Sequence, residues 1–199
     1  IKNIIVLFHG YGGDGKDISI LSLNWKRHLP NTVFICPNGH ETCAINSSGY
    51  QWFDLTKNDP NYILEEAIKS ESIIKQFIYE IKQEFNLTNN QICLSGFSQG
   101  CMMSLNVGLT SEEKFLCIVG FSGKIINQND LKNRIKNFTD TFLIHGDTDQ
   151  IVPSIHLLEA KDFLIRNSVP IQTLMIKNCD HNIPIEASST ALDYILKKS

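Results

Sequence analysis

Short apolar runs alternate with longer amphipathic ones along this 199-residue chain, and this alternation limits the folds available to it. Brief apolar runs predict strands that are covered on both faces. Longer segments with apolar residues three and four apart predict helices that pack on those strands. The pattern therefore predicts an α/β fold, with a mostly parallel central sheet flanked by helices on both faces. The expected strands are residues 4–8, 32–36, 91–95, 116–121, 141–144 and 171–176, and the expected helices are residues 18–29, 62–85, 99–109, 128–137, 154–167 and 186–197.

Composition narrows the possible functions and locations. With 42% hydrophobic residues the chain can bury a full core, and residues 1–199 are expected to form one domain. A formal net charge of −3 argues against nucleic acid as a partner, and no apolar run approaches the roughly 20 residues that span a bilayer, so we expect no stable membrane insertion. The six cysteines are scattered without a Cys-x-x-Cys pair, which favours free thiols in a reducing compartment and a cytoplasmic location.

The sequence Gly-Phe-Ser-Gln-Gly at residues 96–100 lies where an expected strand turns into an expected helix. A serine held between two glycines at such a turn is typical of a nucleophile elbow. Glycine is needed on both sides, because a Cβ at Gly96 or Gly100 would crowd the neighbouring strand and helix. Ser98 is therefore a candidate nucleophile, and an ordinary strand-to-helix turn is the alternative.

Polar residues also follow three other expected strands. Since ligands bind beyond the carboxyl ends of the strands in open parallel sheets, these residues are candidates for a site. A glycine-rich loop at residues 9–15 can direct backbone N–H groups at a developing oxyanion, and it lacks the motifs of phosphate-binding and dinucleotide-binding loops. Asp147 and Asp149 follow the fifth expected strand, and His181 follows the last. The order serine, acid, histidine is the order of the triad in α/β-hydrolases.

His181 is the candidate general base, because it lies in a turn where an imidazole can lean over the sheet edge. The residues alone leave Asp147 and Asp149 as alternatives for its acidic partner. Asp180 is poorly placed, since a side chain adjacent in sequence seldom aligns its neighbour's ring.

His9 and His145 each begin a His-Gly turn at the end of a strand, and we expect them to satisfy backbone groups rather than transfer protons. A metal centre that combines His145 with His181 and the acidic residues is the other interpretation. No His-x-His or His-x-x-x-His spacing supports it, so we expect no metal and no cofactor.

Residues 38–60 form the longest segment expected to be irregular, and they contain Trp52 and Phe53. Loops of this length in a compact domain are usually functional. We therefore expect this segment to form a wall of the substrate site, with Trp52 and Phe53 as substrate-binding residues. No large insertion interrupts the pattern, so we expect no cap domain and a fairly open groove.

Four motifs together with His181 make the chain resemble the acyl-protein thioesterase and carboxylesterase family, also called the phospholipase/carboxylesterase family. They are His-Gly-Tyr-Gly at residues 9–12, Trp-Phe-Asp at 52–54, Gly-Phe-Ser-Gln-Gly at 96–100 and His-Gly-Asp-Thr-Asp-Gln-Ile-Val-Pro at 145–153. The resemblance spans nearly the whole chain and implies the α/β-hydrolase fold.

The resemblance also implies roles for individual residues. It implies a catalytic triad of Ser98, Asp149 and His181. By the same resemblance Asp147 is a neighbouring turn residue, and the backbone N–H groups of Tyr11 and Gln99 form the oxyanion hole, in agreement with the rule that one donor follows the nucleophile.

The activity that the resemblance implies is hydrolysis of carboxylic ester or thioester bonds through an acyl-serine intermediate. The expected substrate is a small acyl ester or thioester, with an acylated protein or a lysophospholipid as further candidates, and the chain is expected to be a monomer or a homodimer. Two alternatives stay open. One is a lysophospholipase-type esterase, and the other is a non-catalytic protein of the same fold that binds acylated ligands.

Overall fold

A computed structural model describes all of residues 1–199, and its centre is one parallel sheet of six strands. All six expected strands are present, with bounds that differ from the expected ones only at the ends. The predicted α/β class with a mostly parallel sheet is confirmed. In spatial order the strands are β2 (Thr32–Ile35), β1 (Asn3–Phe8), β5 (Ile92–Phe97), β6 (Cys117–Phe121), β7 (Thr141–Gly146) and β8 (Ile171–Ile176).

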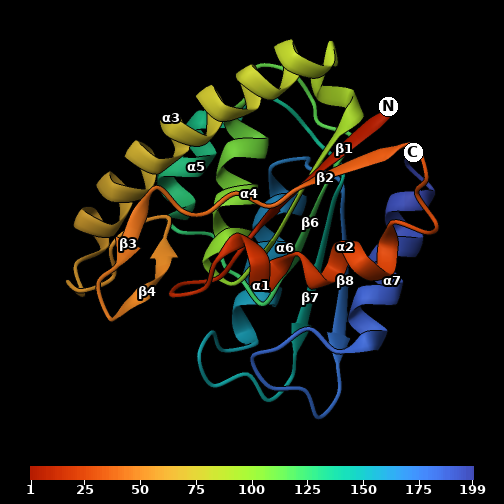
Figure 1. The fold of residues 1–199 in the computed structure, drawn as a ribbon. Coiled ribbons are helices and arrows are strands. Elements are labelled where there is room, and N and C mark those ends of the chain that lie inside the picture. The colour runs from red at the N-terminus through yellow and green to blue at the C-terminus, as the bar shows by residue number, and fades with distance from the viewer.

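Helices cover both faces of this sheet, as Figure 1 shows. They are α1 (Gly15–Ile18), α2 (Ile20–Trp25), α3 (Pro60–Phe85), α4 (Gln99–Thr110), α5 (Gln128–Arg134), α6 (Ile155–Arg166) and α7 (Ile185–Leu196), with a 3₁₀ turn at Asn89–Gln91. One face carries α2 and α7, and the other carries α3, α4 and α6. No helix combines the length and the apolar character that a membrane crossing needs.

The alternation of side chains along each strand supplies both faces of the core. In β1, Ile5 and Leu7 join the cluster beneath α2 and α7, whereas Ile4, Val6 and Phe8 join the cluster beneath α3 and α4. All five side chains are at most 1% exposed. Because β1 is covered on both faces, neither face carries polar side chains. This explains why its sequence is a continuous apolar run.

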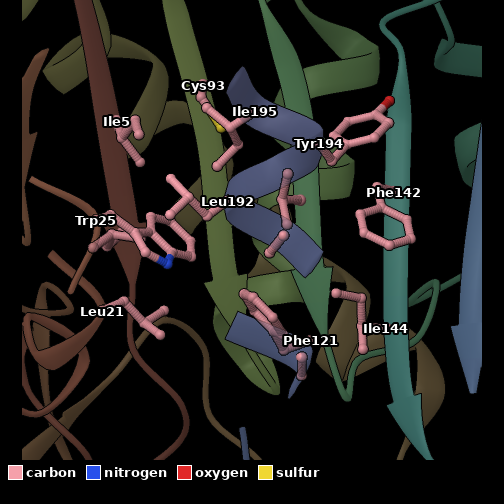
Figure 2. Close-up of a cluster of buried hydrophobic side chains, with 14 of the residues drawn as sticks. Ile5, Leu21, Trp25, Cys93, Phe121, Phe142, Ile144, Leu192, Tyr194 and Ile195 are labelled. Carbon is pink, nitrogen blue, oxygen red and sulfur yellow. The ribbon is translucent and has the colours of Figure 1, made fainter. Parts of the chain in front are cut away.

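Figure 2 shows the side chains packed between the sheet and α7. Trp25 of α2 is buried there, and its indole N–H donates to the carbonyl and the hydroxyl of Ser188 at 3.2 and 3.1 Å. Tyr194 of α7 packs on Phe142 of β7 with ring centroids 4.9 Å apart. The Trp25 hydrogen bonds fix α2, which follows the glycine-rich loop, against α7, and the Tyr194 contact fixes α7 on the sheet.

The helix expected over residues 18–29 is divided into α1 and α2, and it starts earlier and ends earlier than expected. It starts early because Asp14 caps α1 through a reciprocal pair of hydrogen bonds with Asp17. It ends early because the residues before Pro30 close in tighter turns, with the Leu29 N–H donating to the Lys26 carbonyl at 3.3 Å. A residue before proline is disfavoured in the helical conformation.

Residues 38–60 contain an antiparallel hairpin of β3 (Glu41–Cys43) and β4 (Asn46–Gln51), so the expectation of an irregular segment is wrong for these residues. The first three residues of β4 are polar and exposed. A strand of this kind has no apolar alternation that the sequence could display.

The strand order of the sheet reverses at β1. After β1 the chain adds β2 on one side, and it later returns to place β5 on the other side and continues to β8. Loops that leave β1 and β5 therefore diverge at their carboxyl ends and leave a crevice there. The glycine-rich loop follows β1 and Ser98 follows β5, so the topology brings the two together at this crevice.

We expect Ile195→Ala to lower the free energy of unfolding by about 2 to 4 kcal/mol, because it removes a fully buried side chain that attaches α7 to the sheet. Leu196→Ala on the same helix is the matched control, since Leu196 is 39% exposed, and it should cost less than about 0.5 kcal/mol. Urea unfolding followed by circular dichroism measures both. Equal losses would contradict this packing of α7.

Candidate active site

Ser98 lies in the turn between β5 and α4 with a φ of 53° and a ψ of −115°. A positive φ is strained for a residue with a side chain, and such strain persists mainly where the surrounding structure enforces it. The flanking glycines permit the turn. A Cβ on Gly96 would lie 2.3 Å from the carbonyl carbon of Gly100, and a Cβ on Gly100 would lie 2.1 Å from the carbonyl oxygen of Phe8. Any other residue at Gly96 or Gly100 would therefore clash with the backbone and displace the turn that carries Ser98.

Three side chains from separate loops form one hydrogen-bonded chain. The Nε2 atom of His181 lies 3.0 Å from Oγ of Ser98, and its Nδ1 atom lies 2.7 Å from Oδ2 of Asp149. Because a carboxylate only accepts, Nδ1 carries the proton of the neutral ring and Nε2 is left to accept from the serine hydroxyl. The ring of Phe97 packs on the imidazole with centroids 4.7 Å apart and limits its movement.

The Asp149 carboxylate is completely buried. Burial raises its pKa, but hydrogen bonds from His181 and from the backbone N–H groups of Val152 and Ile151 act to lower it. The net result is a pKa below the ordinary value of 3.8. Its Oδ1 atom accepts from the N–H groups of Ile151 and Val152, each at 2.9 Å. Asp149 is therefore ionised at neutral pH and fixed in place.

The two other acidic residues near His181 make different contacts. Asp147 accepts weakly from the backbone N–H of Cys179, at 3.4 Å, and Asp180 accepts from a neighbouring side-chain amide. Neither forms a hydrogen bond with the imidazole. Of the two alternatives that the residues left open, the geometry places Asp149 against His181 and Asp147 in the adjacent turn.

His145 supports the turn that carries the acid. Its Nε2 atom lies 2.8 Å from the carbonyl oxygen of Val152 and 3.4 Å from Oδ2 of Asp149. Burial lowers the pKa of His145, so the ring is neutral and Nε2–H donates to the Val152 carbonyl. His145 thus bonds a backbone group, and no three histidine, cysteine or carboxylate side chains here lie close enough to hold a metal ion together.

The backbone N–H groups of Tyr11 and Gln99, which the sequence indicates as oxyanion donors, donate to no loop carbonyl of the protein. Gln99 is the first residue of α4, where N–H groups have no partner inside the helix and the helix dipole favours negative charge. The loop with Tyr11 passes directly beside the serine, since a Cβ on Gly10 would lie 3.4 Å from the Cβ of Ser98. Both N–H groups are thus free to bind an oxygen near Ser98.

The hairpin holds the glycine-rich loop in place. The N–H of Gly12 donates to the carbonyl of Tyr50 at 2.9 Å, and the N–H of Tyr50 donates to the carbonyl of Gly13 at 2.8 Å. The Asn46 amide donates to the Gly12 carbonyl at 2.8 Å. Gly12 has a φ of 77°, a conformation that favours glycine. The sequence carried no signal for this support, because backbone groups provide most of it.

His9 fixes the start of the same loop. Its Nε2 atom accepts from the N–H of Gly39 at 2.8 Å, so Nδ1 carries the proton and donates to the carbonyl of Gly10 at 2.7 Å. Burial lowers the pKa of His9, which keeps the ring neutral. His9 therefore bonds backbone groups, as the sequence suggested.

Trp52 and Phe53 are only 3% and 1% exposed. Trp52 packs edge-on against Phe8, with centroids 5.1 Å apart, and its indole N–H donates to the carbonyl of His9 at 2.9 Å. Both side chains belong to the core beneath α3 and α4. Their substrate-binding role stays a prediction, and the structure places them behind the glycine-rich loop.

The side chain of Gln99 has a role that the sequence did not indicate. Its Oε1 atom accepts from the N–H of Trp52 at 2.8 Å, and its Nε2 atom donates to the carbonyl of Phe53 at 2.7 Å. The amide is buried and satisfies both backbone groups. It ties the segment after the hairpin to the first turn of α4.

A cavity of about 380 Å³ opens beside His181, between the glycine-rich loop and the loop before α7. It is lined by His9, Gly10, Tyr11, Gly13, Asp17, Ile18, Ile20, Leu21, Phe97, His181, Asn182 and Ile183. Its size is that of a small-molecule site.

Comparison with known proteins places the chain among relatives along nearly its whole length. The sequence profile of the phospholipase/carboxylesterase family matches residues 1–198. Acyl-protein thioesterase 1 of Emericella nidulans is 34% identical over 167 residues, which are 75% of this chain and 70% of that protein. Acyl-protein thioesterase 1 of Saccharomyces cerevisiae is 29% identical over 190 residues, 88% of this chain and 82% of that protein. The crystal structure of esterase PE8 matches with a TM-score of 0.95 and 32% identity, over 100% of this chain and 93% of that one.

Gln99→Ala should lower the free energy of unfolding by about 2 to 4 kcal/mol, because it leaves the N–H of Trp52 and the carbonyl of Phe53 buried without partners. The exposed Gln150 offers a control, since Gln150→Ala should cost less than about 0.5 kcal/mol. Limited proteolysis should also cut residues 38–60 faster in Gln99→Ala. An unchanged cleavage rate would contradict the anchoring role of this amide.

Stability at acid pH tests the environment of Asp149. Because its pKa in the folded protein lies below the ordinary value of 3.8, its ionised form contributes stability that is present above that value and is lost as the pH falls through the lower folded pKa. The difference in unfolding free energy between the wild type and Asp149→Asn should therefore shrink between about pH 5 and pH 3 in urea titrations. A difference that grows over this range would refute the low pKa.

Proposed function

The chain belongs to the phospholipase/carboxylesterase family, and on this premise we propose that it is a single-domain serine hydrolase with Ser98, His181 and Asp149 as its catalytic triad. Family membership makes it an enzyme of the esterase class, and the residue roles are our proposal. One observation supports these residue roles. A buried carboxylate, an imidazole and a hydroxyl on a strained turn form one chain, with contacts of 2.7 and 3.0 Å.

In the first half of the proposed reaction, His181 Nε2 takes the hydroxyl proton of Ser98 while Oγ attacks the carbonyl carbon of the substrate. Asp149 accepts from Nδ1–H and stabilises the imidazolium that forms. The carbonyl oxygen becomes an oxyanion and accepts from the N–H groups of Tyr11 and Gln99. The imidazolium then gives its proton to the leaving oxygen or sulfur, the bond to the acyl carbon breaks, and an acyl-serine remains.

In the second half a water molecule takes the place of the leaving group. His181 removes a proton from the water as its oxygen attacks the acyl carbon, and the same two N–H groups bind the new oxyanion. The imidazolium returns the proton to Oγ of Ser98 when the acyl bond breaks. The carboxylic acid leaves, and the protein returns to its starting state.

Both ester and thioester bonds fit this scheme, because it needs only a leaving atom that His181 can protonate. The relatives are named acyl-protein thioesterase 1 and esterase, which supports each bond type. We propose small acyl esters and thioesters as substrates, with thioester-linked acyl groups on proteins as a further class. All six cysteines are free thiols, which supports the predicted cytoplasmic location.

Ser98→Ala should lower kcat for p-nitrophenyl acetate by about 10⁴-fold or more, because it removes the hydroxyl that receives the acyl unit. Ser104→Ala is the matched control, since Ser104 is a buried serine further along α4 that only donates to the Gly100 carbonyl. It should keep nearly full activity. Thermal melting confirms that both variants are folded, and full esterase activity in Ser98→Ala would overturn the assignment.

A fluorophosphonate probe separates the hydrolase from a non-catalytic binder of acylated ligands. Only an activated serine reacts readily, so mass spectrometry of the digested wild type should find the phosphonate on Ser98. His181→Ala should react far more slowly, because the base is lost. A wild type that binds acyl ligands but resists the probe would favour the binder.

A further inference from the structure

The cavity is lined by His181, whose Nε2 atom lies 3.0 Å from Oγ of Ser98, and by Phe97, the residue before Ser98. One wall is the glycine-rich loop with Tyr11, and the opposite wall is the loop that runs from His181 to Ile183. The segment after β6 also lies close to the serine, since a Cβ on Gly123 would approach the carbonyl of Ser98 to 3.1 Å. No residue of that segment lines the cavity.

The positions of the catalytic groups decide which part of a substrate enters this cavity. The carbon bonded to Oγ of Ser98 carries an oxyanion, an acyl chain and a leaving group. The oxyanion lies at the N–H groups of Tyr11 and Gln99, and the leaving atom must lie within hydrogen-bond reach of Nε2 of His181 to be protonated. The group bonded to the leaving atom therefore extends along His181, and the cavity is the space there.

The surface of the cavity is mainly apolar. Aliphatic and aromatic side chains form it, from α1, α2, the end of β5 and the loop before α7, and these are Ile18, Ile20, Leu21, Phe97 and Ile183. Ile18 and Leu21 are held in the core beneath, whereas Ile20 is 62% exposed at the rim. Contact with such a surface favours an apolar group by about fourfold for each methylene that it buries.

The charge at the cavity is negative. Asp17 is its one carboxylate, and no lysine or arginine lines it. The Asp17 carboxylate is fixed by a hydrogen bond from the N–H of Asp14, at 3.3 Å. Burial lowers the pKa of His9, which also lines the cavity, so this ring brings no positive charge, although Asp14 and Asp17 both act to raise its pKa. A phosphate or carboxylate on the leaving group would meet repulsion from Asp17, with no lysine or arginine at the cavity to offset it.

Resting on the serine-hydrolase function, we propose that this cavity binds the leaving group of the substrate and selects an apolar alcohol or thiol without negative charge. Lysophospholipids and thioesters of phosphate-bearing carriers are therefore poor substrates. Neutral alkyl esters, and thioesters of a cysteine beside apolar side chains, are good ones.

Two series of esters test the assignment of the cavity. Acetates of straight-chain alcohols from ethanol to hexanol vary the leaving group, and ethyl esters of acids from acetate to hexanoate vary the acyl chain. Ile20→Ser and Ile183→Ser should flatten the rise of kcat/KM along the alcohol series and leave the slope of the acid series unchanged. Ile165→Ser, at an exposed isoleucine of α6, is the matched control and should change neither slope. Since Ile20 is exposed, its variant should fold even if Ile183→Ser does not.

The charge is tested with a pair of acetates of similar length, pentyl acetate and 4-acetoxybutanoate. The wild type should prefer the neutral ester, and Asp17→Asn should raise the relative kcat/KM of the anionic one by about three- to fivefold. Asparagine keeps an oxygen that can accept from the N–H of Asp14, so α1 retains its cap. High salt should reduce the same preference in the wild type.

The proposal would be overturned if Ile20→Ser and Ile183→Ser flattened the rise of kcat/KM along the acid series and not along the alcohol series. The cavity would then hold the acyl chain. Unchanged slopes in both isoleucine variants, or an unchanged ratio in Asp17→Asn, would overturn it too. In each of these results the wild type still hydrolyses esters, so the serine-hydrolase function stands. Absence of all hydrolysis in the wild type, without labelling of Ser98, would instead remove that function and this proposal with it.

Discussion

The close approach of the first turn of α4 to the end of β1 is the constraint on which the site depends. Gly100 faces the carbonyl of Phe8 at a distance that excludes any Cβ, and Gly96 faces Gly100 in the same way. Only this spacing lets Ser98 hold its positive φ beside the loop that follows β1. The candidate nucleophile and the proposed oxyanion donors are thus neighbours because two backbone segments are in contact, and the remaining groups are arranged around that contact.

Buried polar side chains hold the backbone around this contact, and most of them take no part in the proposed chemistry. His9 bonds the glycine-rich loop, His145 bonds the turn that carries Asp149, and the Gln99 amide bonds the segment after the hairpin. Each of these three side chains is at most 2% exposed. A buried polar group without a partner costs stability, so these side chains favour one backbone arrangement over its alternatives. The short distances within the proposed triad are consistent with such a fixed backbone.

The parallel sheet and the elbow could be predicted because their causes are local in the sequence. A strand covered on both faces must be apolar throughout, and a strained turn needs glycine on each side of Ser98. The hairpin could not be predicted, because its strands pair with each other through backbone groups and expose polar side chains. Trp52 was expected at the site because it lies in a long loop, and the sequence could not show that tertiary packing buries its side chain; its substrate-binding role stays a prediction. The choice of Asp149 over Asp147 depends on which carboxylate faces His181, and spacing alone does not encode this.

Acid-quench mass spectrometry tests directly whether Ser98 carries the acyl group during turnover. The wild type is mixed with a slowly deacylating p-nitrophenyl ester, stopped with acid during turnover, digested and sequenced. We expect an added mass of one acyl group on the peptide that contains Ser98, located on that serine. Turnover without an acyl adduct, or an adduct on another residue, would contradict it.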